Sequence, residues 1–417
     1  MFIERKIHKD GCLGLIQDFS IAFSLVLIVV LVMKRVNYGL AMLVGTVVLG
    51  ILSGLPPQQF SDVFTMTLLS ISTLELVLIV TLIQILAYSM KKSGMIDEAV
   101  EGIRKVLSGK AVLTVMPALM GSLPMIGGAL LSAPLIDREA ERLGLSREER
   151  SFINVWFRHW SFFINPLSST MILLASLTGF NLYSLVLLQV LPVTIYLILG
   201  YFVSIRKIPD NKSEEDKSKT KERDFLLILH NISPIIITVF LNIMGLNMVV
   251  SLAVGTASVI LLKKAKVSMI WSLLRNGFDW RLSFTMFGVM CFRYMVEASG
   301  SVSSLLPYIE ATALTPNFIL IVVSWVVGAA TAMPTAGIAI IIPMAKIMVE
   351  NLTLALVSIL YLSMVFSYIV SPMHLCLILT VEYYKSRLQT VYRKLIPTAM
   401  ITYAIILVII LTTQSFV

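Results

Sequence analysis

The chain has 417 residues, of which 57% are hydrophobic and only 14% are charged. Soluble domains are typically about 45–50% apolar and about 25% charged, so both figures depart from that class in the same direction. A soluble fold is therefore excluded, and so is intrinsic disorder, which requires few apolar residues. The composition predicts an all-α, polytopic integral membrane protein.

The net charge of +9 comes from 33 basic and 24 acidic residues. Lys and Arg concentrate in a few connecting segments, as in cytoplasmic loops of membrane proteins, so we expect no nucleic-acid partner. The three cysteines are far apart and form no CxxC, which predicts neither a disulfide framework nor a thiolate metal site. The apolar run over 21–33 ends in Lys34-Arg35 without a small-residue cleavage site, which indicates a retained helix and not a signal peptide.

A helix that crosses the hydrocarbon layer needs about 20 apolar residues. Some apolar segments are continuous, two are interrupted at Asn165-Pro166 and Ser371-Pro372, and two are broken in the middle by Pro and Gly. Two others mix charged and apolar residues in the manner of interfacial helices. Continuous spans are expected near 17–33, 37–54, 70–90, 182–204, 225–244, 247–262, 281–298 and 395–413, interrupted spans near 150–180 and 352–382, broken segments near 111–136 and 317–346, and interfacial helices near 95–108 and 268–280.

The charges of the connecting segments predict their sides of the membrane. All the Lys- and Arg-rich segments fall on one side if 111–136 and 317–346 are re-entrant hairpins, each entering and leaving by the same face. Ten full spans then surround the hairpins, and both termini lie outside, where Arg5, Lys6 and Lys9 contradict the rule. The basic segments lie near 91–110, 137–158, 206–223, 263–275 and 385–394, and those without Lys or Arg near 55–69, 179–183, 245–247 and 299–316. The polar stretch 206–223 is predicted to be a disordered cytoplasmic linker.

The two halves of the sequence repeat each other. A shift of about 210 residues aligns LVGTVVLGIL from Leu43 with AVGTASVILL from Ala253, and ordered matches of this kind predict an internal duplication. The same order pairs Pro124 with Pro334, Gly127 with Gly337, Pro134 with Pro343, and Pro166 with Pro372. Each half, 1–205 and 224–417, holds five spans and one hairpin. An odd number of spans starts the second half on the opposite side, so we expect inverted repeats.

The broken segments carry the predicted binding site. Backbone at membrane depth must be hydrogen-bonded unless it is buried in protein or lines a wet cavity, and a proline removes one amide donor. Inverted-repeat transporters use such freed groups to bind anions and Na⁺ near the midplane. Alternatively, the prolines only kink their helices and the hydroxyls bond back to their own helices. The candidate substrate- or ion-binding residues are Ser122, Pro124, Gly127, Gly128, Asn165, Pro166, Ser168, Ser169, Thr331, Pro334, Thr335, Gly337, Ser371, Pro372 and His374.

Ionisable residues inside spans are further candidates for anion attraction or coupling. Arg158 shares a helix face with Asn165, and it either attracts an anion or snorkels to the headgroups. His159 precedes the same break, and Arg293 lies four residues before Glu297, with which it can pair. His374 is either a proton carrier or a hydrogen-bonded helix contact. No carboxylate clearly occupies mid-membrane, which favours an anionic substrate.

Enzyme signatures are missing from the sequence, which contains no HExxH, GxSxG or GxGxxG. The segment GIRKVLSGKA from Gly102 has the wrong spacing for a phosphate loop and ends in Ala where Ser or Thr binds Mg²⁺. We therefore expect neither an enzyme nor an ATP-driven pump. No cofactor or metal is expected beyond a candidate Na⁺ coupling ion at the hairpin tips.

The two halves, with their hairpins and breaks, resemble the ion transporter superfamily, which includes divalent anion/sodium symporters, gluconate permeases and citrate–metal symporters. The segment GSLPMIGGALLSAPLIDREAERLGLSREERSFINVWFRHW from Gly121 is most similar to an uncharacterised prokaryotic integral membrane protein family, domain of unknown function 401. The resemblance implies a homodimeric, elevator-type carrier with its sites at the hairpin tips and helix breaks. The Ser-Asn-Thr tips of the dicarboxylate branch are replaced here by Ser-Leu-Pro-Met around Ser122 and Ala-Met-Pro-Thr around Thr335, so dicarboxylate specificity is not carried over.

The sequence as a whole predicts a secondary transporter in the bilayer of the cytoplasmic membrane. It would move a small anionic organic solute and be driven by Na⁺ or H⁺. Two alternatives stay open: a membrane-embedded enzyme that uses Arg158, His159 or His374, and a non-transporting scaffold or receptor subunit.

Overall fold

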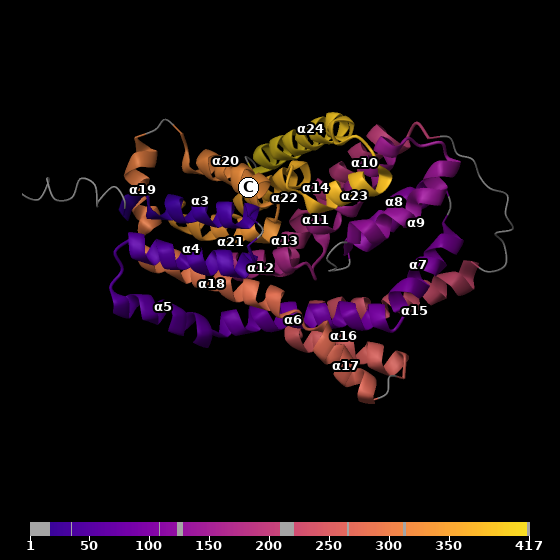
Figure 1. Cartoon of the computed structure of the whole chain (residues 1–417), viewed down its shortest axis with the longest axis horizontal. Coiled ribbons are helices and arrows are strands. Elements are labelled where there is room, and N and C mark those ends of the chain that lie inside the picture. The colour runs from indigo at the N-terminus through magenta and orange to yellow at the C-terminus, as the bar shows by residue number, and fades with distance from the viewer. Residues whose placement is uncertain are drawn as a thin grey trace, which may run out of the picture. The chain divides into compact units, whose positions relative to one another are not determined.

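A computed structural model describes residues 17–414 except 35, 108, 123–127, 209–220, 265–266 and 312–313. All regular structure in the described residues is helical, which confirms the all-α part of the predicted fold class (Figure 1). The candidate residues Pro124 and Gly127 lie outside the described residues, as do most of the linker 206–223 and the basic N-terminal residues.

The described helices fall into two compact units, and each unit combines segments from both halves of the sequence. The first unit comprises Met1–Val77, Ile172–Phe180 and Trp280–Met373, and the second comprises Leu78–Met171, Asn181–Asp279 and His374–Val417. Two helices contribute residues to both units, namely α6 (Ile71–Lys92) and α12 (Ser169–Thr178).

The first unit is built around two helix pairs, α4 with α18 and α20 with α22. The α4–α18 pair is close because two glycines face each other: a Cβ added at Gly288 would lie 2.7 Å from the carbonyl oxygen of Gly39. Small residues at such a crossing let the two backbones approach, as in many membrane helix pairs. The helices of this unit are α3 (Ser20–Met33), α4 (Tyr38–Leu52), α5 (Pro57–Leu69), α18 (Trp280–Ser299), α19 (Ser301–Glu310), α20 (Pro316–Thr331), α21 (Pro334–Met348) and α22 (Leu354–Val370).

The second unit places α10 against α8, α9, α23 and α24, and packs α15 against α7 and α16. Its largest buried side chain is Trp156, which stacks on Tyr196 with ring centroids 4.1 Å apart. The helices of this unit are α7 (Met95–Val106), α8 (Lys110–Ser122), α9 (Gly128–Arg142), α10 (Arg147–Arg158), α11 (Ser161–Ile164), α13 (Leu182–Leu188), α14 (Val190–Gly200), the π-helical η1 (Tyr201–Ile205), α15 (Lys221–Ile243), α16 (Met248–Leu262), α17 (Val267–Gly277), α23 (Leu375–Tyr384) and α24 (Leu388–Gln414).

Six helical stretches of the described chain are long and apolar enough to cross a membrane. They are Ile71–Lys92, Arg147–Thr178, Leu182–Ile205, Asp224–Ile243, Leu354–Tyr384 and Leu388–Thr413. Helices also occupy the other predicted spans, but α3, α4 and α16 have only 14, 15 and 15 residues. These lengths are below the about 20 residues of an upright span, so the count of ten spans stays a prediction.

Two connecting segments and one span show helices or breaks that the sequence analysis did not specify. The segments near 55–69 and 299–316 contain the helices α5 and α19, and α5 begins at Pro57, a residue that suits a first helical turn. The span over 182–204 is divided at Gln189 into α13 and α14. Pro192 explains the division, because it cannot donate to the carbonyl four residues earlier.

Helices at corresponding places in the two sequence halves have matched lengths and caps. The α4 and α16 helices have 15 residues each, and the side chains of Asn37 and Asn247 cap their N-termini. The α12 and α23 helices, which follow the two proline breaks, have 10 residues each. The backbone turns left-handed at Gly94 and Gly300, with φ values of 78° and 63°.

Candidate functional site

The first break joins α11 to α12 within the predicted span 150–180, and its side chains complete the end of a hairpin helix. The last carbonyls of any helix have no partner within it, and Ser122 is the last residue of α8 that the structure describes. Asn165 donates from Nδ2 to the Ser122 carbonyl at 3.1 Å, and Ser161 donates from Oγ to the Gly121 carbonyl at 2.8 Å. The Oδ1 atom of Asn165 accepts from the Leu167 amide at 3.0 Å, which forms the turn around Pro166. The break is therefore hydrogen-bonded to the hairpin and not merely kinked.

The second break, in the first unit, has the same geometry. Ser371 donates from Oγ to the carbonyl of Ala329 in α20 and accepts at 3.0 Å from the Met373 amide, around Pro372. The donor and acceptor are 43 residues apart in the Asn165 pair and 42 in the Ser371 pair. In each half, the residue before the proline thus joins the break to the first helix of the preceding hairpin.

The other hairpin residues have mainly local contacts. The hydroxyls of Ser122 and Thr331 bond back to the carbonyls of Ala118 and Val327 in their own helices. Pro334 is the first residue of α21, and a Cβ at Gly337 would overlap the sulfur of Met364. Several candidates lie near these ends without a role that the geometry defines: Gly128 starts α9, Ser168 and Ser169 are half-buried at the start of α12, and Thr335 is buried in α21.

Arg158 is a buried cation at the last residue of α10. Its side chain is only 7% exposed, so it does not reach out as a snorkelling arginine would. Its Nη1 atom is buried, and it has no hydrogen-bond partner among the described residues. The helix is held in place here by close packing, because a Cβ at Gly121 of α8 would overlap the Arg158 carbonyl oxygen. Such a guanidinium group is energetically unfavourable unless an anion or another acceptor reaches it.

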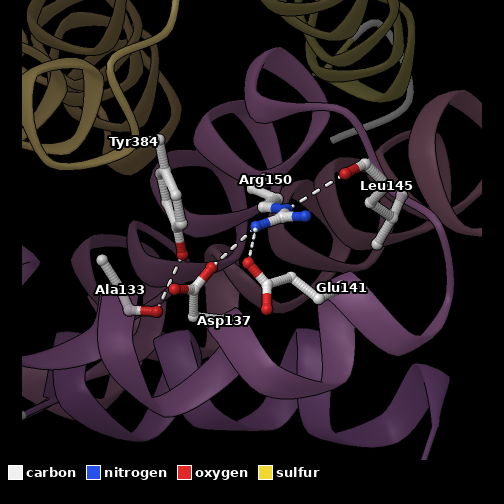
Figure 2. A network of polar contacts seen from close by, with 6 residues as sticks. All are labelled: Ala133, Asp137, Glu141, Leu145, Arg150 and Tyr384. Carbon is white, nitrogen blue, oxygen red and sulfur yellow. Dashed lines mark hydrogen bonds and ion pairs between the residues drawn. The ribbon is translucent and has the colours of Figure 1, made fainter.

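Arg150, near the other end of α10, differs from Arg158 because its guanidinium group has carboxylate and carbonyl partners (Figure 2). Its Nη1 atom lies 2.9 Å from Asp137 Oδ1 and 3.0 Å from Glu141 Oε1, both on α9, and Nε donates to the Leu145 carbonyl. Tyr384 of α23 donates to the Ala133 carbonyl of α9 at 2.8 Å. The hairpin helix α9 is therefore anchored to α10 and α23 by polar contacts.

The guanidinium group of Arg293 also has partners in the structure. Its Nε atom lies 3.0 Å from Glu297 Oε1, four residues on, and its guanidinium lies 5.3 Å from the centre of the Tyr294 ring. The pairing considered from the sequence is therefore present. Arg293 therefore has a carboxylate partner, which makes it a weaker candidate for anion attraction than Arg158.

A cluster of three ligand-type side chains, not expected from the sequence, lies in the second unit. His159 follows α10, His374 precedes α23, and Cys376 is in the first turn of α23. One ligand atom from each lies within 4.8 Å of the other two. The histidine side chains are 1% and 0% exposed, and their rings meet edge to face with centroids 4.6 Å apart. Rules based on residue spacing could not predict this cluster, because the two breaks are far apart in the sequence.

The all-helical fold, its long apolar helices and its polar breaks define a membrane-embedded helical protein. The chain belongs to the family described as "Protein of unknown function (DUF401)", whose model matches residues 17–413. A search of curated proteins found no match.

Proposed function

We propose that this protein is a secondary active transporter of the ion transporter superfamily type. It would carry a small anionic organic solute across the cytoplasmic membrane, driven by Na⁺ or H⁺, as a homodimer with its linker 206–223 in the cytoplasm. Broken helices joined to hairpins support this proposal, because non-helical backbone at membrane depth is tolerated where it serves a site or is buried in protein.

The proposal of an anionic substrate rests on the buried guanidinium group of Arg158. A guanidinium group has five N–H donors and always carries its charge. In the described residues Arg150 and Arg293 have carboxylate partners, whereas the buried Nη1 of Arg158 has no acceptor. A carboxylate, sulfonate or phosphate group of a solute would supply both the missing acceptor and the opposite charge.

The matched geometry of the two halves supports a duplicated carrier. The same side-chain-to-carbonyl bond occurs at both breaks, and α4 matches α16 as α12 matches α23. Two equivalent hairpin–break pairs are what we expect of a carrier built from two repeats. The inverted orientation of the repeats is part of the proposal.

A direct test is the current that the purified protein produces in proteoliposomes on a solid support. Small carboxylates, sulfonates and phosphate esters would be applied in NaCl, in choline chloride and across a pH step. We expect a solute-dependent current that Arg158→Gln removes and Arg293→Gln keeps. An unchanged current in Arg158→Gln would refute the role of Arg158. Turnover of a solute in detergent, without a gradient, would favour the membrane enzyme instead, and a stable co-purifying partner with no current would favour the scaffold subunit.

A further inference from the structure

We propose that His159, His374 and Cys376 form a binding site for a borderline-soft transition-metal ion of the Zn²⁺ type. Imidazole nitrogen and thiolate sulfur together favour such ions over Mg²⁺ or Ca²⁺, which take oxygen ligands. The proposal does not require the proposed transport activity, since the ligands are defined by their own geometry.

The distances are close to those of a metal centre. Zn²⁺ binds nitrogen at about 2.0–2.1 Å and sulfur at about 2.3 Å, which places tetrahedral ligands roughly 3–4 Å from one another. The three ligand atoms here lie within 4.8 Å of one another, so small side-chain rotations would close the shell. They come from the end of α10 and the start of α23, which pack together in the second unit.

The hydrogen bonding of His159 supports ligation. Its Nδ1 atom is hydrogen-bonded to the Val155 carbonyl. A carbonyl only accepts, so Nδ1 carries the proton, and in a neutral ring the lone pair is then on Nε2. Metal-binding histidines are typically oriented in this way, through an N–H donated to a carbonyl or carboxylate.

The proposed metal site has a positive net charge and one open coordination position. A divalent ion would displace the thiol proton of Cys376 to solvent and leave a net charge of about +1 on the metal and its three protein ligands. Three protein ligands leave the fourth tetrahedral position to water or an anion. Arg158, next to His159 in the chain, adds positive charge beside the cluster and so favours an anion over water in that position.

Cobalt(II) provides a spectroscopic test. Reduced, metal-stripped, tag-free protein in detergent would be titrated with Co²⁺ and then with Zn²⁺. We expect one Co²⁺ per chain, with a thiolate-to-cobalt charge-transfer band and intense tetrahedral d–d bands, which Zn²⁺ removes. Cys376→Ser should lose the charge-transfer band, and His159→Gln and His374→Asn should bind at least about tenfold more weakly. Cys291→Ser, which changes a buried cysteine of α18 in the first unit, should leave the spectrum unchanged.

A second measurement needs no variant and so does not depend on how the variants fold. Zn²⁺ should slow alkylation of Cys376 by N-ethylmaleimide in the wild-type protein, as read by peptide mass spectrometry, whereas Mg²⁺ should not. Equal alkylation with and without Zn²⁺, or a charge-transfer band that persists in Cys376→Ser, would overturn the site. Neither readout uses transport, so failure here leaves the carrier proposal standing, and loss of transport leaves the metal site standing.

Discussion

The side-chain amide of Asn165 donates to the carbonyl of Ser122, and the hydroxyl of Ser371 donates to the carbonyl of Ala329. Each donor directly precedes a proline, and each acceptor lies in the last turn of a hairpin's first helix. A single side chain therefore forms the turn of a broken span and joins that span to a hairpin helix. Prolines that only kinked their spans would not require this pairing in both halves.

Replacing Asn165 by Asp separates its two roles. The aspartate keeps an acceptor for the Leu167 amide but loses the donor to the Ser122 carbonyl. An unpaired carbonyl in a partly buried place costs about 1–3 kcal/mol, and we expect the unfolding free energy to fall by that amount. Ser371→Ala should have a similar effect. Thermal unfolding in detergent measures both.

Ser122→Ala is the matched control for these two variants. Among the described residues, the Ser122 hydroxyl bonds only to the Ala118 carbonyl of its own helix, and such bonds contribute little. Its loss should change the stability by less than about 0.5 kcal/mol. If Ser122→Ala destabilised the protein as much as Asn165→Asp, the account of the break would be wrong.

Gly121 and Gly328 should differ in how they tolerate a methyl group. A Cβ at Gly121 would overlap the backbone oxygen of Arg158, whereas at Gly328 the nearest atom is the hydroxyl of Ser367. Overpacking costs about 1–3 kcal/mol, so either change to Ala should destabilise the protein. Adding Ser367→Ala should recover part of the stability of Gly328→Ala, because the clashing atom is removed. No such second change relieves a backbone clash.

Melting temperatures of the single and double variants decide this prediction. Recovery in the double variant, with Ser367→Ala alone as the reference, supports the packing described. The absence of any recovery would mean that the Met364 carbonyl, 3.1 Å from the added Cβ, dominates the clash instead.

The sequence located the two helix breaks at Asn165-Pro166 and Ser371-Pro372, because Pro marks them directly. Hairpin helices α20 and α21 meet at Ala332-Met333, between the predicted limits, since proline is favoured in the first turn of a helix and Pro334 starts α21. The pairing of Arg293 with Glu297 also followed from local spacing. Local rules suffice wherever the partners lie within one helical turn.

The rest depended on contacts between segments far apart in the chain. No rule based on local sequence predicts that His159 contacts His374. Nor does such a rule predict whether the Arg158 guanidinium is buried or reaches the headgroups. The α5 helix was missed because QQ and D residues lower its apolar content, so it did not resemble a span. Each of the two units also combines segments from both halves of the sequence, and the hydrophobic periodicity of the sequence does not show this.

The ion pair between Glu98 of α7 and Lys263 gives a small dependence of stability on pH. Lys263 donates to Glu98 at 2.7 Å, and this hydrogen bond holds the pKa of Glu98 below its usual value of 4.5. The unfolded chain therefore binds more protons below pH 4.5, so the pair's contribution is complete above that pH and is lost as the pH falls through the folded pKa. Because Glu98 is partly exposed, we expect less than about 1 kcal/mol.

Unfolding measured across this acidic range in wild type and Glu98→Gln tests the prediction. The two curves should differ near neutral pH and converge in acid. Glu101→Gln is the control, since its pair with Lys105 is longer, at 3.7 Å, and both side chains are more than half exposed. A constant offset between wild type and Glu98→Gln at every pH would contradict the assignment.

The central claim is that Arg158 binds an anionic solute, and a melting experiment on the purified protein tests it most directly. Wild type, Arg158→Gln and Arg293→Gln would be heated with a panel of small carboxylates and other anions, in NaCl and in choline chloride. A ligand at about 100 times its dissociation constant adds about 2.7 kcal/mol to the folded state. The account predicts a rise in melting temperature with at least one anion in wild type and Arg293→Gln, and none in Arg158→Gln. An equal rise in Arg158→Gln, or no rise in wild type with any anion, would contradict it.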